Sequence, residues 1–266
     1  MKKYYDHKHN RLIYLGQSSD PQYWDNHWKK ANSVEAIKSK KNRLIVNLTR
    51  KYLPENSRII DGGCGSGDKV YALQKHGFDA YGVDFAKKTV QFINTGLPDL
   101  KVSLGDIRKL NFPDHFFDGY WSLGVIEHFF DGFEDIIHEI YRVLRPGGFL
   151  FLTVPEMSKY RKYLSRKGRY VDCSDSDINT NIFYQFAYAP EYIKQIISKN
   201  GFELKKYKPM DGVKGFKDES KHFQSIFQWI YDHPSLPVKV IKRLLDIIMS
   251  PLTGHSGLYI FYKSKH

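Results

Sequence analysis

Three kinds of feature are scarce in this chain of 266 residues, and each absence narrows what the protein can be. Only two cysteines are present, Cys64 and Cys173, which are too few for a disulfide framework and fit a reducing compartment. No run of about 18 apolar residues occurs, so no membrane-spanning helix is expected. The polar residues after Met1 lack the apolar core of a signal peptide. We therefore expect a cytoplasmic protein.

Acidic residues are also scarce relative to basic ones, and the net charge is +12. Such a charge allows a nucleic acid or an anionic lipid as partner. It equally describes a lysine-rich, solvated surface, and this second interpretation is favoured because charge alone identifies no site. Hydrophobic residues make up 41% of the chain, which is ample for a globular core.

Short apolar strands alternate with helical segments in the middle of the chain. We expect strands at 58–61, 80–84, 101–104, 117–125 and 149–154, and helices at 68–76, 86–94 and 133–144. A turn is expected at 145–148. The alternation predicts an α/β fold with a mostly parallel sheet and helices on both faces.

The flanking segments complete a single domain, residues 1–266. Residues 1–54 are expected to form an N-terminal helical lid that includes a helix at 32–53, and residues 55–155 form the core. Two insertions, 156–188 and 213–255, are placed on the rim where strands end. The first holds no clean helix or strand, whereas the second contains helices at 216–231 and 236–249. A helix at 190–200, a strand at 202–207 and a last strand at 257–263 complete the prediction.

A glycine-rich loop, Asp-Gly-Gly-Cys-Gly-Ser-Gly at 61–67, leaves the first core strand and enters a helix. Glycines allow a tight turn and a close approach of ligand to backbone, and the helix N-terminus behind them suits an anion. A dinucleotide fingerprint that starts at Gly63 would need its last glycine where Asp68 stands. The loop is therefore not typical of NAD-binding proteins.

Acidic residues follow the next two strands. Asp84 ends its strand, where a carboxylate can accept hydrogen bonds from both hydroxyls of a ribose. Gly105-Asp106-Ile107 follows the third strand, and Asp106 also suits a plain turn.

With the turn Leu144-Arg145-Pro146-Gly147-Gly148, these motifs resemble class I S-adenosylmethionine (SAM)-dependent methyltransferases, and most of all the methyltransferase type 11 group with its quinone-biosynthesis enzymes. The resemblance covers roughly residues 55–155. It implies a Rossmann-like fold with a closing antiparallel strand and SAM as cofactor. It also places Asp106 at the adenine amino group and Ile107 against the ring. The implied cofactor-binding residues are Asp61, Gly63, Cys64, Gly65, Gly67, Asp84, Phe85, Asp106, Ile107 and Leu123.

Glu127 and His128 follow the fourth strand, beside the expected position of the reactive methyl group. Methyl transfer needs alignment of the nucleophile, and a base only if the acceptor arrives protonated. His128 has an unperturbed pKa near neutrality and is the candidate base, with Glu127 as its orienter or as a contact to the amino group of the cofactor. Alternatively, both residues only shape the loop. Relatives with Glu-x-x-Glu-His here bind a divalent metal, but Gly124 replaces the first Glu, so no metal is expected.

The acceptor is the least determined part of the prediction. A small-molecule or lipid- or glycan-linked acceptor, methylated at oxygen, is favoured. The helix at 236–249 has an apolar stripe that suits a core-facing helix better than a membrane-surface one, although a roof over a substrate channel and peripheral membrane contact remain open. RNA methylation is the alternative that the charge allows, but no Asn-Pro-Pro-Tyr-type motif supports it. A non-catalytic SAM-binding protein is the other alternative.

Overall fold

The computed structural model describes residues 1–29, 33–173 and 178–264. In chain order its elements are β1 (Lys2–Asp6), β2 (Arg11–Leu15), α1 (Pro21–Lys29), α2 (Val34–Ser39), α3 (Arg43–Tyr52), β3 (Arg58–Gly62), α4 (Asp68–Lys75), β4 (Asp79–Asp84), α5 (Lys87–Gly96), β5 (Val102–Leu104), β6 (Phe117–Leu123), the 3-10 helix η1 (Ile126–His128), α6 (Glu134–Val143), β7 (Leu144–Pro155), α7 (Lys159–Arg166), β8 (Val171–Asp172), the 3-10 helix η3 (Thr180–Ile182), β9 (Phe183–Ala187), α8 (Pro190–Lys199), β10 (Phe202–Met210), α9 (Gly212–Glu219), α10 (Gln224–Asp232), α11 (Leu236–Thr253) and β11 (Ser256–Lys263).

The main sheet has seven strands in the order β10-β11-β7-β6-β3-β4-β5. The five strands from β7 to β5 are parallel to one another, and β11 runs antiparallel to both of its neighbours, β10 and β7. The predicted α/β class, the mostly parallel sheet and the closing antiparallel strand are therefore confirmed. The expected turn at 145–148 is instead part of β7, which begins at Leu144.

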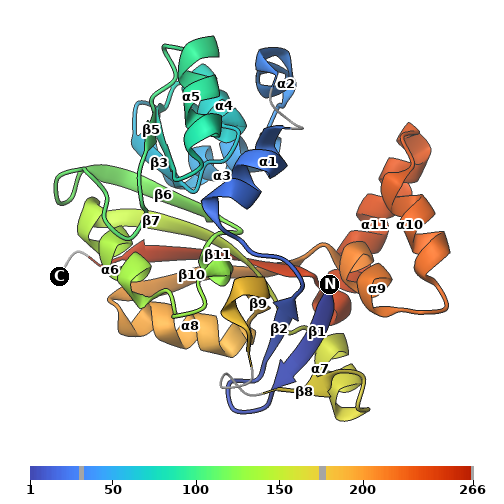
Figure 1. Ribbon diagram of the computed structural model, residues 1–266. Helices are drawn as coiled ribbons and strands as arrows, with labels where there is room; N and C mark the ends of the chain where they lie inside the picture. The colour runs from blue at the N-terminus through green and yellow to red at the C-terminus, as the bar shows by residue number, and fades with distance from the viewer. Residues whose placement is uncertain (30–32, 174–177, 265–266) are drawn as a thin grey trace.

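Helices cover both faces of this sheet, as predicted (Figure 1). Side chains alternate between two apolar clusters, so that Ile59 and Trp121 pack with the helices α3, α4 and α5, whereas Ile60 and Tyr120 pack with α6 and α8. This alternation follows from the period of two residues in a strand. It leaves the carboxyl ends of β3, β4 and β6 as the edge where the chain turns into loops.

A second sheet, in the order β8-β1-β2-β9, corrects two expectations. The first 15 residues form a hairpin, not a helix, and residues 156–188 contain α7, β8 and β9. Both faces of β2 are buried, because Ile13 packs near Phe186 while Leu12 packs near Met157. The partner strand β9 lies some 170 residues along the chain, which local sequence patterns cannot reveal.

The helix expected at 32–53 is two helices, α2 and α3, and its expected first residue, Asn32, lies outside the described residues. Ser33 caps α2 by accepting a hydrogen bond from the Ala36 N–H at 3.0 Å. The break falls at Asn42, whose backbone is left-handed with φ of 40°. Its side-chain amide donates to the Asp68 carbonyl and carboxylate at 3.0 Å, so a tertiary contact overrides the helical pattern.

The helices α9, α10 and α11 (residues 212–253) project from the rest of the molecule, and we call them the arm (Figure 1). The apolar stripe in the sequence favours a core-facing helix at 236–249. That expectation is wrong, because Leu236, Leu244 and Ile248 in α11 are 56–75% exposed. No helix in the described ranges is long and apolar enough to cross a membrane.

Thr49 tests the packing of α3 against the sheet. Its buried hydroxyl accepts a hydrogen bond from the Trp121 indole N–H at 3.0 Å. Thr49→Val leaves this buried donor without a partner, so we expect it to lower the free energy of unfolding by about 1–3 kcal/mol in urea denaturation. Thr95 in α5 is the control. Like Thr49, it donates its hydroxyl to the carbonyl four residues earlier, but Thr95 is exposed. Thr95→Val is expected to change stability by less than about 0.5 kcal/mol. Equal effects would contradict the proposed role of the buried bond.

Candidate cofactor and active site

The glycine-rich loop is held against β4 by hydrogen bonds that its backbone N–H groups donate. Gly63 N–H donates to the Val83 carbonyl at 2.8 Å, and Gly65 N–H donates to the Asp84 carboxylate at 2.8 Å. Both glycines are left-handed, with φ of 78° and 51°. A Cβ at Gly63 would lie 2.6 Å from a Val125 methyl group. The loop therefore needs glycine at these positions for its conformation and for its close approach to neighbours.

Asp84 lies where the prediction placed it, at the carboxyl end of β4. Its second carboxylate oxygen accepts a hydrogen bond from the Ala86 N–H at 2.9 Å. The side chain is almost completely buried, and this burial raises its pKa despite the backbone donors. The carboxylate thus fixes the glycine-rich loop to the turn after β4.

Unpartnered polar atoms gather at this edge of the sheet. Among the described residues, seven buried side-chain N or O atoms have no hydrogen-bond partner, and five of them belong to Asp61, Tyr120, Ser122 and Glu127. Both carboxylate oxygens of Asp61 are in this group. Burial raises the pKa of Asp61 to about 7 and that of Glu127 to about 8. Because buried polar groups are normally paired, this cluster indicates a place for a polar ligand.

A cavity of about 200 Å³ opens among the loops that follow β3, β4 and β6, although Asp61, Tyr120, Ser122 and Glu127 do not themselves line it. It is lined by five of the predicted residues together with Lys69, Gly124 and the helix α1; the five are Gly63, Asp84, Phe85, Leu123 and His128. Lys69 is in the first turn of α4, and its ammonium group lies 3.6 Å from the Asp68 carboxylate. Desolvation lowers the pKa of Lys69, but the charges of Asp61 and Asp68 outweigh it and raise the pKa overall.

Helix α1 covers the cavity. Asp25 anchors it by accepting hydrogen bonds from the Thr89 N–H at 2.9 Å and the Thr89 hydroxyl at 3.1 Å, at the start of α5. The rings of Trp24 and Trp28 stack with 6.1 Å between their centroids, and both residues line the cavity. A Cβ at Gly65 would lie 2.4 Å from the Trp28 ring. The Trp28 indole therefore lies directly on the glycine-rich loop.

The other predicted cofactor residues do not line this cavity; they are Asp61, Cys64, Gly65, Gly67, Asp106 and Ile107. Cys64 is fully buried in the core, so only its backbone is available, and burial raises its thiol pKa. The N-cap residue Gly67 turns toward apolar residues of α5 and β5, and Ile107 is packed in the core beside β4.

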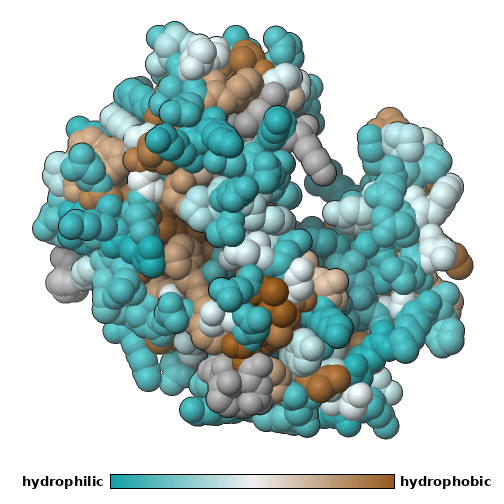
Figure 2. Space-filling view, viewed as in Figure 1, coloured by the Kyte–Doolittle hydropathy of each residue, from teal (hydrophilic) through white to brown (hydrophobic). Residues whose placement is uncertain are grey.

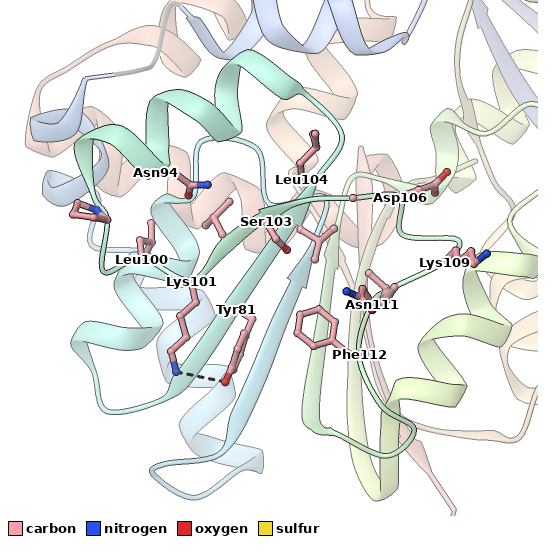
Figure 3. Close-up of a pocket in the computed structure, with 15 residues that line it drawn as sticks. Tyr81, Asn94, Leu100, Lys101, Ser103, Leu104, Asp106, Lys109, Asn111 and Phe112 are labelled. Atoms are coloured by element: carbon pink, nitrogen blue, oxygen red, sulfur yellow. Dashed lines mark hydrogen bonds between the residues drawn. The ribbon is translucent and has the colours of Figure 1, made fainter.

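Asp106 is paired with Arg108 at 2.6 Å and lines a separate open groove of about 660 Å³ along β5. Figure 3 shows Asp106 at the opposite end of this groove from Lys101 and Tyr81. Its carboxylate is therefore engaged by a neighbouring guanidinium, and the structure does not bring it together with Asp84 around one cavity.

His128 is oriented by a strand of the second sheet. Its Nδ1 lies 2.6 Å from the Tyr184 carbonyl oxygen in β9. Since that oxygen can only accept, Nδ1 carries the proton and Nε2 is left with a lone pair. Burial lowers the pKa of His128 to about 4, with a further contribution from His27. The orienting partner is thus Tyr184 and not Glu127, whose Oε2 has no partner among the described residues.

Sequence reasoning missed Lys69, Tyr184 and the direct contact of Trp28 with the loop. Lys69 is two residues after Gly67, so its place in the first turn of α4 was a usable signal. Tyr184 carried no signal, because its role depends on the pairing of β2 with β9.

Within the described ranges, no group of three or more His, Cys, Asp or Glu side chains could hold a metal ion. The expectation of metal-independent activity stays a prediction.

The comparisons with known proteins agree with this geometry. Residues 60–152 match the family model described as a methyltransferase domain. Demethylmenaquinone methyltransferase from Geobacillus sp. is 26% identical over 130 residues, which are 46% of this chain and 55% of the relative. A SAM-dependent Diels-Alderase from Talaromyces variabilis is 27% identical over 168 residues, 59% of this chain and 56% of the relative. The chain thus spans slightly more than half the length of these relatives.

Residues 60–152, about a third of the chain, are thus similar to the methyltransferase domain of this family. A SAM-dependent methyltransferase from Methanosarcina mazei has the same fold, with a TM-score of 0.55 and 17% identity over 82% of this chain and 98% of that one. The predicted resemblance to SAM-dependent methyltransferases and the Rossmann-like fold are therefore confirmed, and SAM is the cofactor that this domain class uses. Individual site residues and the acceptor are not decided by these likenesses.

Proposed function

We propose that this protein transfers the methyl group of SAM to an oxygen of a small-molecule or lipid- or glycan-linked acceptor. The observation that carries the proposal is the buried, unpartnered carboxyl group of Asp61 beneath a loop of left-handed glycines. A ligand with a cationic group and a flat, polar body would satisfy both features. SAM has an ammonium group, a carboxylate and a ribose, and it fits these residues.

Each part of SAM has a residue of suitable chemistry in this site. Asp61 would hold the ammonium group, Lys69 the carboxylate and Asp84 the ribose hydroxyls, while Gly63 and Gly65 allow close approach. When bound, SAM supplies a methyl group on a sulfonium centre whose leaving group is a neutral thioether. The chain therefore has to align the acceptor and does not need an acid for the leaving group.

The covering helix α1 must move when SAM binds. The cavity of about 200 Å³ is smaller than the roughly 300–1,000 Å³ typical of ligand sites. The Trp28 ring, which lies on Gly65, takes up part of the missing space. We infer that α1 acts as the lid and that its two tryptophans close over the bound cofactor after Trp28 has shifted.

His128 is the residue that would face the acceptor. Its Nε2 lone pair can accept a hydrogen bond from a hydroxyl group, and Nδ1 is fixed by the Tyr184 carbonyl. A pKa of about 4 makes His128 a weak base that is neutral at physiological pH. We therefore propose that it orients the hydroxyl and takes its proton late, as charge develops on the oxygen.

A second candidate is a SAM-binding protein that does not transfer the methyl group. The likeness to a relative named a SAM-dependent Diels-Alderase favours this candidate over RNA methylation. The cofactor residues have the same role in both candidate functions. The two functions differ only in whether the methyl group is transferred from SAM, which a labelled methyl group would reveal.

One test of the proposed function concerns Asp61 and the pH dependence of ligand binding. In the ligand-free protein its pKa is about 7, so below pH 7 the carboxyl group must lose a proton before it can pair with an ammonium group. We expect the Kd for S-adenosylhomocysteine to rise about tenfold per pH unit as pH falls from 6.5 to 5.5. Calorimetry at several pH values measures this slope. Asp61→Asn should abolish it and weaken binding at pH 7.5 by roughly tenfold to 150-fold, the loss of one charge-assisted bond.

Glu127→Gln is the matched control, because Glu127 is also buried and its pKa is also raised. It should keep the pH slope. If Glu127→Gln loses the slope and Asp61→Asn keeps it, the ammonium group belongs at Glu127 and our placement is wrong.

A second test separates binding from chemistry at His128. His128→Ala should keep the affinity for S-adenosylhomocysteine within about threefold and lower kcat by about 10², at the low end for positioned proton transfer. The measurement is transfer of labelled methyl from saturating SAM to hydroxyl-bearing fractions of a lipid extract. Because the pKa of His128 is about 4, wild-type kcat should not fall through its protonation between pH 8 and 5.5.

Two outcomes would contradict this account. Full activity of His128→Ala on a hydroxyl acceptor would remove His128 from the chemistry. Absence of labelled product from the wild type, with S-adenosylhomocysteine still bound, would favour the SAM-binding protein that transfers nothing.

A further inference from the structure

Helix α11 turns its polar side toward the protein and its apolar side outward, which is the opposite of an ordinary amphipathic surface helix. Its small and polar residues face the protein, where the Asp246 carboxylate accepts from the Val213 N–H at 2.9 Å and the Ser250 hydroxyl accepts from the Gly212 N–H at 3.0 Å. The Thr253 hydroxyl donates to the Gly212 carbonyl at 2.9 Å. A surface helix normally turns its apolar stripe toward the core. Here hydrogen bonds to α9 occupy the inner side.

The outer side of α11 is apolar along its whole length. Seven large side chains in this helix are at least half exposed, namely Leu236, Val240, Ile241, Leu244, Ile247, Ile248 and Leu252. With about 100° between successive residues, they fall within an arc of about 160° around the helix. Patches of this extent are uncommon on proteins that work without a partner.

The rest of the arm also exposes apolar side chains. Phe223, Ile226 and Trp229 recur every three residues at α10 and are 52–57% exposed. Eleven of the seventeen exposed large hydrophobic residues in the described ranges lie between 223 and 252. Figure 2 shows hydrophobic residues at the tip and the outer edge of the arm, next to hydrophilic ones on the side toward the viewer.

Basic residues border the apolar arc. Lys239, Lys242 and Arg243 are in the first two turns of α11, whereas its one acidic residue, Asp246, is turned inward. At helical spacing Lys239 and Arg243 lie within about 60° of Leu236, at the margin of the arc. The Lys242 ammonium group stands 3.7 Å from the centre of the Tyr231 ring. The exposed side of the helix thus combines apolar and cationic groups.

The base of the arm is firmly attached, so this surface is held in place. Arg161 of α7 and Lys3 of β1 both pair with Glu219 at the end of α9, at 2.9 and 2.8 Å. The Arg161 and Glu219 side chains are only 1% and 2% exposed. Buried, hydrogen-bonded charges of this kind are strongly disrupted when one partner is lost. The arm therefore stands out from the body from a fixed base.

We propose that the apolar outer face of α11 docks on the surface of an anionic lipid bilayer. The apolar arc lies at the boundary between headgroups and acyl chains, and Lys239 and Arg243 contact lipid phosphates. Such interfacial helices combine a wide apolar face with flanking Lys and Arg residues. A second copy of the chain fits less well, because it would bring the same cations together with no outward acid on α11 to meet them. The net charge of +12 also favours an anionic surface over a second copy of the chain.

The test is flotation of the full chain with phosphatidylcholine vesicles and with phosphatidylcholine–phosphatidylglycerol vesicles. We expect binding to the anionic vesicles and at least about tenfold weaker binding to the neutral ones. The double variant Leu244→Ser, Ile248→Ser and the double variant Lys239→Glu, Arg243→Glu should each weaken binding by about tenfold or more. Leu44→Ser is the matched control, since Leu44 is 53% exposed on α3, and it should bind like wild type.

Three results would overturn the proposal. They are absence of wild-type flotation, unchanged binding by the Leu244/Ile248 variant, and a wild-type dimer in sedimentation equilibrium that the same variant dissociates. The last would assign the surface to a second copy. Circular dichroism checks the fold of each variant. Docking does not depend on methyl transfer, and S-adenosylhomocysteine affinity should stay unchanged in the arm variants, so failure here is distinguishable from failure of the proposed function.

Discussion

The carboxyl group of Asp61 is buried at the end of β3 with no partner for either oxygen, and its free-energy cost shapes the site around it. A buried carboxylate is costly without a compensating charge or donor, so the free protein favours its protonated form near neutral pH. Lys69 and the glycine-rich loop lie on the same side of the sheet. The charge of Lys69 lowers the pKa of Asp61 and so offsets part of this cost, but no donor reaches either oxygen. A cationic ligand that reaches Asp61 would therefore supply the hydrogen bonds that the protein itself does not.

The positions of several proposed cofactor residues were predictable from sequence, because they depend on local signals. Gly63 and Gly65 follow β3 and Asp84 ends β4, and parallel strands bring their carboxyl ends to one edge. The same reasoning predicted Asp106, but a side-chain pair with Arg108 that sequence patterns do not reveal holds it at another groove. The helical break at Asn42 has a similar cause, since a contact with Asp68 decides the backbone there.

The acceptor half was not predictable, because distant segments build it. The carbonyl that orients His128 belongs to β9, which pairs with the N-terminal hairpin. The stripe of α11 was visible in the sequence, but the pattern alone could not say which side faced the protein. Three hydrogen bonds between α9 and the polar side of α11 settle that question. If the arm docks on lipid, an amphipathic acceptor would meet the protein at the surface that already holds it.

The central claim is that the glycine-rich loop and Asp61 form a SAM site, and calorimetry tests it most directly. The purified chain should bind S-adenosylhomocysteine at one site with a Kd in the micromolar range, about −8 kcal/mol, and should give no heat with NAD. Heat from NAD with none from S-adenosylhomocysteine would contradict the account.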